Sequence, residues 1–475
     1  MSSTTDTFST SRFASGAGGS GIAGAFSKLS SFGSVGLGRG SASVGSSLAA
    51  SALFGGTAEE KIVLDIGSFS LRAGFSGDSA PLHTAELFSN YTAVGPMHRL
   101  AGSKHGIYDF PIGDQELLDA LLLEQVKEVY RSHLLLDSKS RKVVVAESAL
   151  MPIQLKRALA RVLLCNLRVP QITFYPSAVV ALMSCGITSG LVVDCGHKQT
   201  TVTPVYDGRP LIPYMTSTPL AGEALFESLK SLIKKHAQFV PFDGNARGVA
   251  VTDDMLSDDV CRHIQTKVLY VSPLSIPGTL SKKTVELSVG EVDPRLVEWF
   301  EQSITGSPTI TLTISTKTHG HGTLKIPGWV RERAAEVLLA GDSTEDCMGL
   351  VEAIVACIEN LDVDLRRPLA SKILMVGGVS DVPHLRIRLL HDLVAKMRSI
   401  PKWTALADNV ALAEEKQQTR DNGVVVESSA NGLIFKSSDR CWIGASLAAA
   451  SKIGGVELKR DDFDGYNVAD WTAGI

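Results

Sequence analysis

The sequence predicts a large α/β body of more than one lobe, preceded by a disordered tail rich in glycine and serine. The chain has 475 residues and is 44% hydrophobic, which is enough apolar material for a large folded body. From Lys61 onward, short apolar runs alternate with segments of helical periodicity, as in α/β proteins. Two turns of the pattern Asp-x-Gly, each at the end of an apolar run, lie far apart in this body.

Residues 1–58 differ in composition from the rest of the chain. They are crowded with Gly and Ser and hold only four charged side chains, Asp6, Arg12, Lys28 and Arg39. Such a segment buries too little apolar area to offset the entropy of ordering, so we expect it to be disordered. Its Ser-rich, acid-poor character would also suit an organellar transit peptide, but Gly interrupts most turns of any amphipathic helix.

Charge and cysteine content exclude several classes of protein. Lys and Arg number 46 against 50 Asp and Glu, whereas nucleic-acid binding driven by bulk charge needs a basic face. Seven scattered cysteines without a CxxC pair predict reduced thiols in a cytosolic or nuclear protein. Residues 169–193 carry no charged side chain, but Pro and Gly punctuate them as in a buried strand–helix–strand unit rather than a membrane span.

Apolar runs and helical periodicity assign the elements of the body in order. The first half is expected to contain strands at 62–64 and 71–75, a helix within 112–133, a strand at 143–145 and a helix from Pro152 to 167. The second half is expected to contain strands at 191–193 and 200–205, helices at 220–234 and 258–270, an edge strand at 309–316, helices at 332–339 and 349–360, and a strand at 373–376.

Three glycine-bearing turns form the candidate binding site. Asp65-Ile66-Gly67-Ser68 and Asp194-Cys195-Gly196-His197 each end a strand, and each Gly lets backbone N–H groups approach an anion. Two such turns that face each other can grip the phosphates of a nucleotide, with the aspartates holding a cation through water. Gly377-Gly378, at the end of a further strand, permits close packing against a flat adenine ring.

At these turns the chain resembles the actin superfamily. The segments that carry the resemblance are DIGSFSLRAGFSGDSAP (65–81), VVDCGHKQTTVTPVYDG (192–208), LDVDLRRPLASKILMVGG (361–378) and CWIGASLAAAS (441–451). The resemblance covers about 59–470 and implies an actin-like (ribonuclease H-like) fold of two α/β lobes. Each lobe would be built on a five-stranded sheet, with a nucleotide cleft between them. On this pattern 1–58 is the tail and 59–475 the body, of which 59–183 and 440–475 form the outer lobe and 184–439 the inner lobe.

The resemblance also implies the ligand and the residues that bind it. We expect ATP or ADP with magnesium, bound and not hydrolysed, with Asp65 and Asp194 holding the metal through water. The implied nucleotide-binding residues are Asp65, Gly67, Ser68, Arg72, Asp194, Gly196, Gly377 and Gly378. The alternative is a vestigial cleft that holds the lobes together without a ligand.

Departures from the actin pattern argue against catalysis. Actin's water-activating Gln is matched by Ser177, and the His that assists that water is matched by Thr201. Because hydrolysis needs a positioned base or water-orienting group, we expect no ATP hydrolysis and no catalytic residue. The remaining departures lie in the two turns and at the nucleoside. In the first turn this chain has Phe69 where actin has a second Gly, and Arg72 where actin has a phosphate-contacting Lys. In the second turn it has His197 and Lys198 where actin has Asp and Gly, and the Lys-Glu pair that actin points at the nucleoside is matched by Gln265 and Thr266.

A short outer segment points to a terminal position in a filament. Glu147 follows Asp65 by only 82 positions, and the shortage relative to actin falls in 82–110. This is the place of the small outer subdomain whose loop inserts into the next filament subunit. Its content here offers no apolar loop for such an insertion. A subunit shortened in this way could join a filament end by its opposite face and accept no further subunit.

Further segments resemble the actin-related subunits of dynactin. They are VVVAESALMP (143–152), RALARVLL (157–164), YPSAVVALMSCGITSGLVVDCG (175–196) and PLAGEAL (219–225). The resemblance implies a non-catalytic subunit that caps the pointed end of the actin-like filament and docks the pointed-end subcomplex. It would support dynein-driven transport on microtubules from the cytoplasm and cytoskeleton, with filament subunits and pointed-end subunits as direct partners.

Two other classes of function remain open, a nuclear actin relative and an enzyme of the same fold. A nuclear actin relative of a chromatin-remodelling complex would also lose catalysis, but such relatives usually gain insertions. A sugar kinase of the same fold would need a further catalytic carboxylate in the cleft, because Asp65 and Asp194 are already assigned to the phosphate turns. A chaperone-type ATPase would need a substrate domain after the fold, and none is expected before Ile475.

Overall fold

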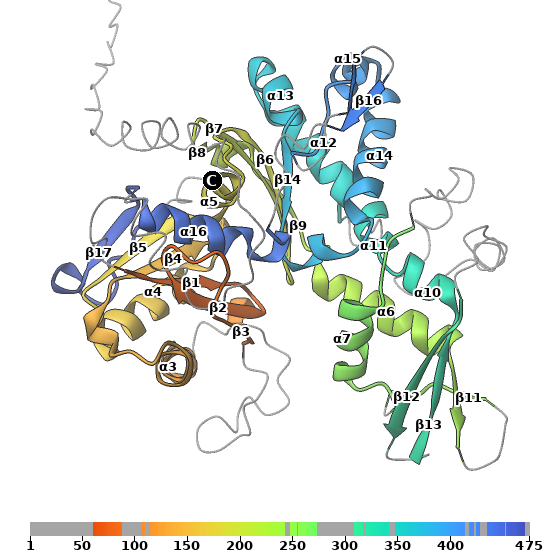
Figure 1. Ribbon diagram of the computed structural model, residues 1–475, viewed down its shortest axis with the longest axis horizontal. Coiled ribbons are helices and arrows are strands. Elements are labelled where there is room, and N and C mark those ends of the chain that lie inside the picture. Colours follow the sequence, from red (N-terminus) through yellow and green to blue (C-terminus); the bar gives the residue numbers. More distant parts are fainter. Residues whose placement is uncertain are drawn as a thin grey trace, which may run out of the picture.

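The computed structural model describes most of the predicted body, and residues 1–58 lie outside the described part. The described residues are 60–87, 107–109, 115–242, 248–253, 255–272, 308–316, 320–341, 347–413, 418–421, 424–427, 435–451 and 453–470. They form two large sheets with helices around them, the first at the left of Figure 1 and the second above it near the centre.

The first sheet has six strands in the order β17-β5-β4-β1-β2-β3. β1, β4 and β5 run parallel to one another, and the other pairings are antiparallel. The strands are β1 (Ile62–Ile66), β2 (Ser70–Phe75), β3 (His83–Glu86), β4 (Val143–Glu147), β5 (Gln171–Pro176) and β17 (Val456–Lys459). The resemblance implied five strands, and the sixth arises because β17 pairs antiparallel with β5.

Both faces of the first sheet are covered, which explains why its strands are continuous apolar runs. On one face, Ile62, Leu64 and Ile66 pack against helices α3 (Gln115–Glu128) and α4 (Ile153–Ala160). Alternate side chains of a strand point to opposite faces, so Val63 packs on the other face, in the cluster that contains α5 and α16. One π-helical segment follows each of α3 and α4, at Val129–Leu134 and Arg161–Asn166.

The second sheet has five strands in the order β14-β6-β7-β8, with β9 also paired to β7. The strands are β6 (Gly190–Cys195), β7 (Thr200–Tyr206), β8 (Arg209–Pro210), β9 (Thr216–Thr218) and β14 (Ile373–Val376). The accompanying helices are α6 (Gly222–His236), α7 (Asp258–Lys267), α12 (Leu350–Asn360), α13 (Val363–Ala370), α14 (Leu385–Arg398) and α15 (Thr404–Ala407). Only β14 runs parallel to β6.

Two smaller sheets complete the described part of the chain. One has the order β11-β10-β13-β12 and comprises β10 (Gln238–Pro241), β11 (Val249–Ala250), β12 (Ile310–Thr316) and β13 (Gly320–Ile326). The edge position of β12 confirms the strand predicted from its alternating sequence. A hairpin of β15 (Gln418–Asp421) and β16 (Val424–Glu427) forms the other.

Two of the predicted segments around these sheets have a clear outcome. The uncharged segment 169–193 is a strand–helix–strand unit, as predicted, in which β5 leads into α5 (Ser177–Ser184) and then β6. No helix in the described part of the chain is long and apolar enough to cross a membrane. The single helix predicted at 332–339 is wrong, because a turn separates α10 (Gly328–Arg333) from α11 (Glu336–Ala340) and brings Arg333 onto Glu336.

The helix pair α5 and α16 (Arg440–Ala450) joins the two sheets. Its core contains Val144 from the first sheet and Val192 from the second. The helices cross so closely that a Cβ at Gly444 would lie 1.7 Å from the carbonyl oxygen of Val180. Only glycine allows this approach. The crossing therefore fixes how the two sheets sit relative to each other.

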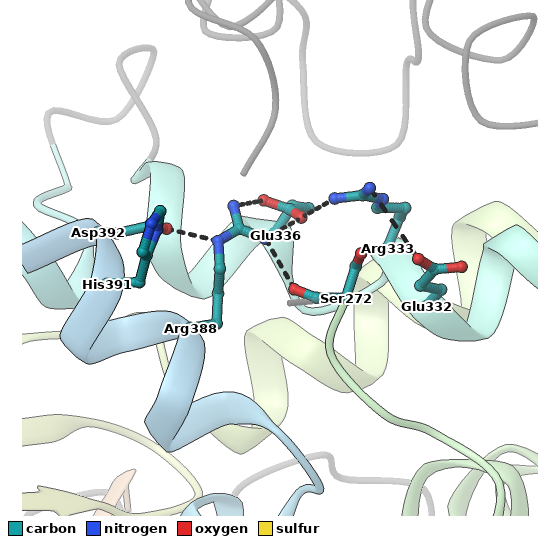
Figure 2. A network of polar contacts seen from close by, with 7 residues as sticks. All are labelled: Ser272, Glu332, Arg333, Glu336, Arg388, His391 and Asp392. Atoms are coloured by element: carbon teal, nitrogen blue, oxygen red, sulfur yellow. Dashed lines mark hydrogen bonds and ion pairs between the residues drawn. The ribbon is translucent and has the colours of Figure 1, made fainter. Parts of the chain in front are cut away.

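A buried network of charges holds α14 against α11 (Figure 2). The guanidinium of Arg388 makes a bidentate contact with Glu336, with both distances 3.0 Å, and donates to Asp392 at 2.7 Å. It also donates to the carbonyl of Ser272 at 3.0 Å, where the chain enters the segment 273–307 that lies outside the described residues. Arg333 adds a second contact to Glu336 at 2.8 Å. Arg388 is only 3% exposed, so its charge is satisfied almost entirely by the protein.

We expect Arg388→Met to destabilise the protein by about 3–5 kcal/mol, because it leaves the partly buried Glu336 and Asp392 with fewer partners. The measurement is thermal unfolding of the purified full chain. The matched control is Arg398→Met, which removes an Arg–Asp408 pair whose side chains are 60% and 66% exposed, and should change stability by less than about 1 kcal/mol. Equal melting temperatures for the two variants would contradict a structural role for the network.

Candidate functional site

A cavity of about 710 Å³ opens between the two large sheets. Its walls come from the first hairpin (β1–β2, turn 67–69), the second hairpin (β6–β7, turn 196–199), α6, α7 and the segment after β14. All of the predicted nucleotide-binding residues line it: Asp65, Gly67, Ser68, Arg72, Asp194, Gly196, Gly377 and Gly378. The structure thus brings the three glycine-bearing turns to one place.

The two hairpins are built alike. In the first, the Gly67 N–H donates to the Ser70 carbonyl at 2.9 Å, and in the second the Gly196 N–H donates to the Gln199 carbonyl at 3.2 Å. Asp65 lies near the end of β1 and Asp194 near the end of β6. Each glycine amide is therefore engaged in its own turn, and each aspartate faces the cavity from the end of a strand.

Asp65 and Asp194 are partly buried carboxylates with few positive charges near them. Burial raises the pKa of Asp65, and the guanidinium of Arg72, 3.3 Å away, partly offsets this. Burial, and then repulsion from Asp65, raise the pKa of Asp194 to about 6. Arg72 also contacts Asp439 at 3.2 Å, so one cation serves three carboxylates. An arrangement of this kind favours a further positive charge in the cavity.

Gly377 marks the closest approach of the third turn to the second hairpin. Its φ of +88° is the left-handed conformation that favours glycine. A Cβ there would lie 2.4 Å from the carbonyl oxygen of Cys195 and 2.7 Å from Oδ1 of Asp194. Gly378, by contrast, has no atom within 4 Å of its Cβ position, so it leaves space on the cavity side.

The tips of the two hairpins touch. The Lys198 N–H lies 3.4 Å from the Ser68 hydroxyl oxygen, and the rings of Phe69 and His197 are 4.5 Å apart between centroids. The ammonium of Lys198 pairs with the carboxylate of Glu223 at 2.9 Å. We call the Ser68, Phe69, His197 and Lys198 contacts the hairpin clasp.

The positions that match actin's catalytic residues also line the cavity. Ser177 and Thr201 carry hydroxyls and are 7% and 4% exposed. A hydroxyl is a poor general base near neutral pH. Gln265 and Thr266 line the cavity too, and the Gln265 amide donates to the carbonyl of Gly222 at 3.0 Å.

Several residues in or beside the cavity were missed by sequence reasoning. Tyr108 belongs to a short 3-10 turn at Ile107–Asp109 and lies beside Ser148. Asp439, at the start of α16, reaches Arg72 across more than 360 positions of sequence. Glu86 and Arg262 meet across the cavity mouth at 3.5 Å. No local motif marks these residues, because each acquires its place through long-range packing.

The fit of a magnesium nucleotide is uneven along this cavity. The open space beside Gly378 and the paired carboxylates fit the base and the cation. The gap between the hairpin tips, where a phosphate chain would pass, is filled by the clasp. The residues present therefore fit the adenosine end and the metal better than they fit a long phosphate chain.

Fold and cleft together define a two-lobed α/β protein whose lobes face each other through paired Asp-x-Gly hairpins. The family model described as Actin matches residues 56–243 and 330–465. This match covers well over half of the chain, so the protein belongs to the actin family. It leaves 244–329 unmatched between the two matched segments.

Relatives in this family are distant. Actin-related protein 4 of Arabidopsis thaliana is 24% identical over 397 residues, covering 72% of this chain and 86% of that protein. Centractin of Saccharomyces cerevisiae is 25% identical over 419 residues, covering 83% and 97%. Actin-related protein 10 of Dictyostelium discoideum is 20% identical over 361 residues, covering 72% and 74%. The chain is thus similar to actin-related proteins of more than one kind.

Alanine at the two neighbouring glycines should have opposite consequences. Gly377→Ala forces a Cβ against Cys195 and Asp194 at a positive φ, and should destabilise the protein by about 2 kcal/mol or more. Gly378→Ala meets nothing in the fold and should change stability by less than about 0.5 kcal/mol. Thermal unfolding of both variants checks this. A Gly377→Ala protein as stable as Gly378→Ala would contradict the packing described.

Asp194→Asn should stabilise the ligand-free protein near neutral pH. The pKa of Asp194 is about 6 in the fold against 3.8 for a solvated carboxyl, so the folded state binds this proton more tightly than the unfolded chain. Ionisation of Asp194 therefore lowers stability as the pH rises from about 4 to about 6, by up to about 3 kcal/mol. We expect a higher melting temperature for the variant near neutral pH, measured with EDTA and no nucleotide.

The pH dependence separates this effect from a general one. The advantage of Asp194→Asn should shrink as the pH is lowered toward about 5, where the wild-type carboxyl is protonated. Asp461→Asn, at a side chain that is 86% exposed, serves as the control and should show no such dependence. A variant that melts below the wild type at every pH would rule out the electrostatic account.

Proposed function

We propose that this protein is an actin-related subunit of dynactin that caps the pointed end of that complex's actin-like filament. It would also dock the pointed-end subcomplex and so support dynein-driven transport along microtubules in the cytoplasm. The segments that resemble actin-related protein 10, called 11 in vertebrates, support this assignment (143–152, 157–164, 175–196 and 219–225). Similarity to centractin and to an actin-related protein 10 agrees with it.

The observation that carries the proposal is the short connection between β3 and α3. β3 ends at Glu86 and α3 begins at Gln115, and we expect this connection to be too short to carry the loop that inserts into a next subunit. A filament subunit without this loop can be added at a pointed end but cannot accept a successor there. This is the property that a cap requires.

The cleft would hold an adenine nucleotide, ATP or ADP, with magnesium, and would not turn it over. Asp65 and Asp194 would hold the metal through water, and Gly377 and Gly378 would lie against the base. The metal would supply the positive charge that offsets both the phosphates and these carboxylates. Since Ser177 and Thr201 offer no base, we expect no ATPase activity.

A nuclear actin-related subunit of a chromatin-remodelling complex is the second candidate. The relatives named actin-related protein 4 fit this candidate as well as centractin and actin-related protein 10 fit the dynactin subunit. The segment 244–329, which the family model does not match, is a specific feature in its favour, because nuclear actin relatives usually gain insertions.

Native affinity purification of the tagged full chain distinguishes the two candidates. We expect recovery in a large particle with an actin-like filament protein and dynactin's pointed-end subunits, because a cap is retained by its filament. Parallel assays of the purified chain should detect no ATP hydrolysis above a buffer control. Recovery with nucleosome-remodelling subunits instead would overturn the dynactin assignment and leave the family membership standing.

A surface variant sharpens this test. Val363 is the first residue of α13 and is 73% exposed, and α13 lies far from β3 in Figure 1. Val363→Asp should reduce recovery of the filament protein without lowering stability, since an acidic residue is favourable at a helix N-terminus. Leu135→Asp, at an equally apolar side chain that is 76% exposed, is the matched control. Equal recovery with both variants would exclude the α13 end as the filament-binding face.

A further inference from the structure

Three of the four residues of the hairpin clasp, Phe69, His197 and Lys198, are departures from the actin pattern. Phe69 takes the place of a glycine in the first turn, and His197 and Lys198 take the places of Asp and Gly in the second. Their contacts are the ring pair at 4.5 Å and the Lys198 N–H to Ser68 contact at 3.4 Å. The departures therefore meet one another across the cavity.

A guanidinium from α7 closes the clasp on a third side. The Arg262 carbon Cζ lies 4.5 Å from the centroid of the Phe69 ring, and Nη1 lies 3.5 Å from Glu86 of β3. Arg262 belongs to α7, which packs with the second sheet, and its side chain contacts the edge strand β3 of the first sheet. It therefore links the two sheets. Stacking of this kind holds the Phe69 ring between an arginine and a histidine from the opposite side of the cavity.

The cations around the hairpin tips are already neutralised. Lys198 pairs with Glu223 at 2.9 Å, and Arg72 pairs with Asp65 at 3.3 Å. Arg262 pairs with Glu86. A terminal phosphate placed here would have to displace the Phe69–His197 ring contact. Each of these three cations already has a carboxylate partner.

A phosphate oxygen that bridges the two turns must hold their donors apart. With hydrogen bonds of about 2.9 Å on each side, the two donors stand roughly 4–6 Å from each other. At the clasp the Lys198 nitrogen and the Ser68 hydroxyl oxygen are 3.4 Å apart, and the Phe69 and His197 rings pack beside each other. The adenosine end is different, because Gly378 opens onto free space.

We propose that the hairpin clasp makes the cleft selective for adenosine diphosphate and excludes the triphosphate. The inference rests on the proposed adenine-nucleotide cleft and narrows its ligand. Phe69 and His197 are the residues that determine the selectivity, because their rings occupy the space that the terminal phosphate would need. The lobes are then held together by the protein itself at the position where a terminal phosphate would otherwise join them.

Calorimetric titration of the full chain with magnesium ADP and magnesium ATP tests this. The wild type should bind ADP at least about tenfold more tightly than ATP, a difference of about 1.4 kcal/mol. Phe69→Gly opens the gap from the first hairpin, and His197→Gly opens it from the second. Both should reduce the preference for ADP to about threefold or less. Phe69→Leu, which keeps most of the side-chain bulk, is the matched control and should retain it.

The outcomes separate this inference from the proposal beneath it. Wild type that binds ATP as tightly as ADP would overturn the selectivity while leaving a nucleotide cleft. Absence of binding by ADP, ATP and adenosine would overturn both, and the partner test above would remain the measure of the capping role. Should Phe69→Gly fail to fold, His197→Gly carries the comparison, since it removes the same ring contact from the other side.

Discussion

The crossing of α5 and α16 is the contact on which the geometry of the protein depends. Gly444 lies against the backbone of Val180 so closely that no side chain fits between them. The core around this crossing takes side chains from both large sheets, and Trp442 donates from it to the carbonyl of Val63 in β1 at 3.1 Å. Because the crossing sets the distance between the sheets, it also sets the distance between the hairpins that leave them.

At this distance between the hairpins, the carboxylates in the cleft repel each other, and the neighbouring side chains only partly offset this repulsion. Asp65 and Asp194 are held near each other, and Arg72 is shared with Asp439. A protein that used the cleft only as a core would be expected to lose such carboxylates, since buried charges are costly unless paired. Their presence supports a cation or a metal-bound ligand in the cavity, whereas the paired Lys198 and Arg262 give no support to a free anion.

Local sequence was enough to predict strands β1, β2, β4, β6, β7, β12 and β14, the strand–helix–strand unit and the three glycine-bearing turns. Each depends on residues near in sequence, such as the run Ile62-Val63-Leu64 or the turn after Asp194. Local sequence could not predict that β17 adds a sixth strand, nor that Asp439 reaches Arg72, because both result from packing between distant segments. The clasp lies between these extremes: Phe69 and His197 were visible as departures, but only the fold brings their rings together.

The clasp and the expected lack of ATP hydrolysis have the same consequence, which is a constant distance between the two hairpins. A nucleotide that is hydrolysed must change the distance between the two hairpins, because its terminal phosphate is bound and then lost. In this chain the hairpins contact each other directly, and the positions that would orient an attacking water carry the hydroxyls of Ser177 and Thr201. On the proposed function, a cleft built in this way would have one resting separation, and no chemical step would alter it. On the proposed function that is an advantage, since a subunit that ends a filament needs a lasting conformation rather than a cycle between two.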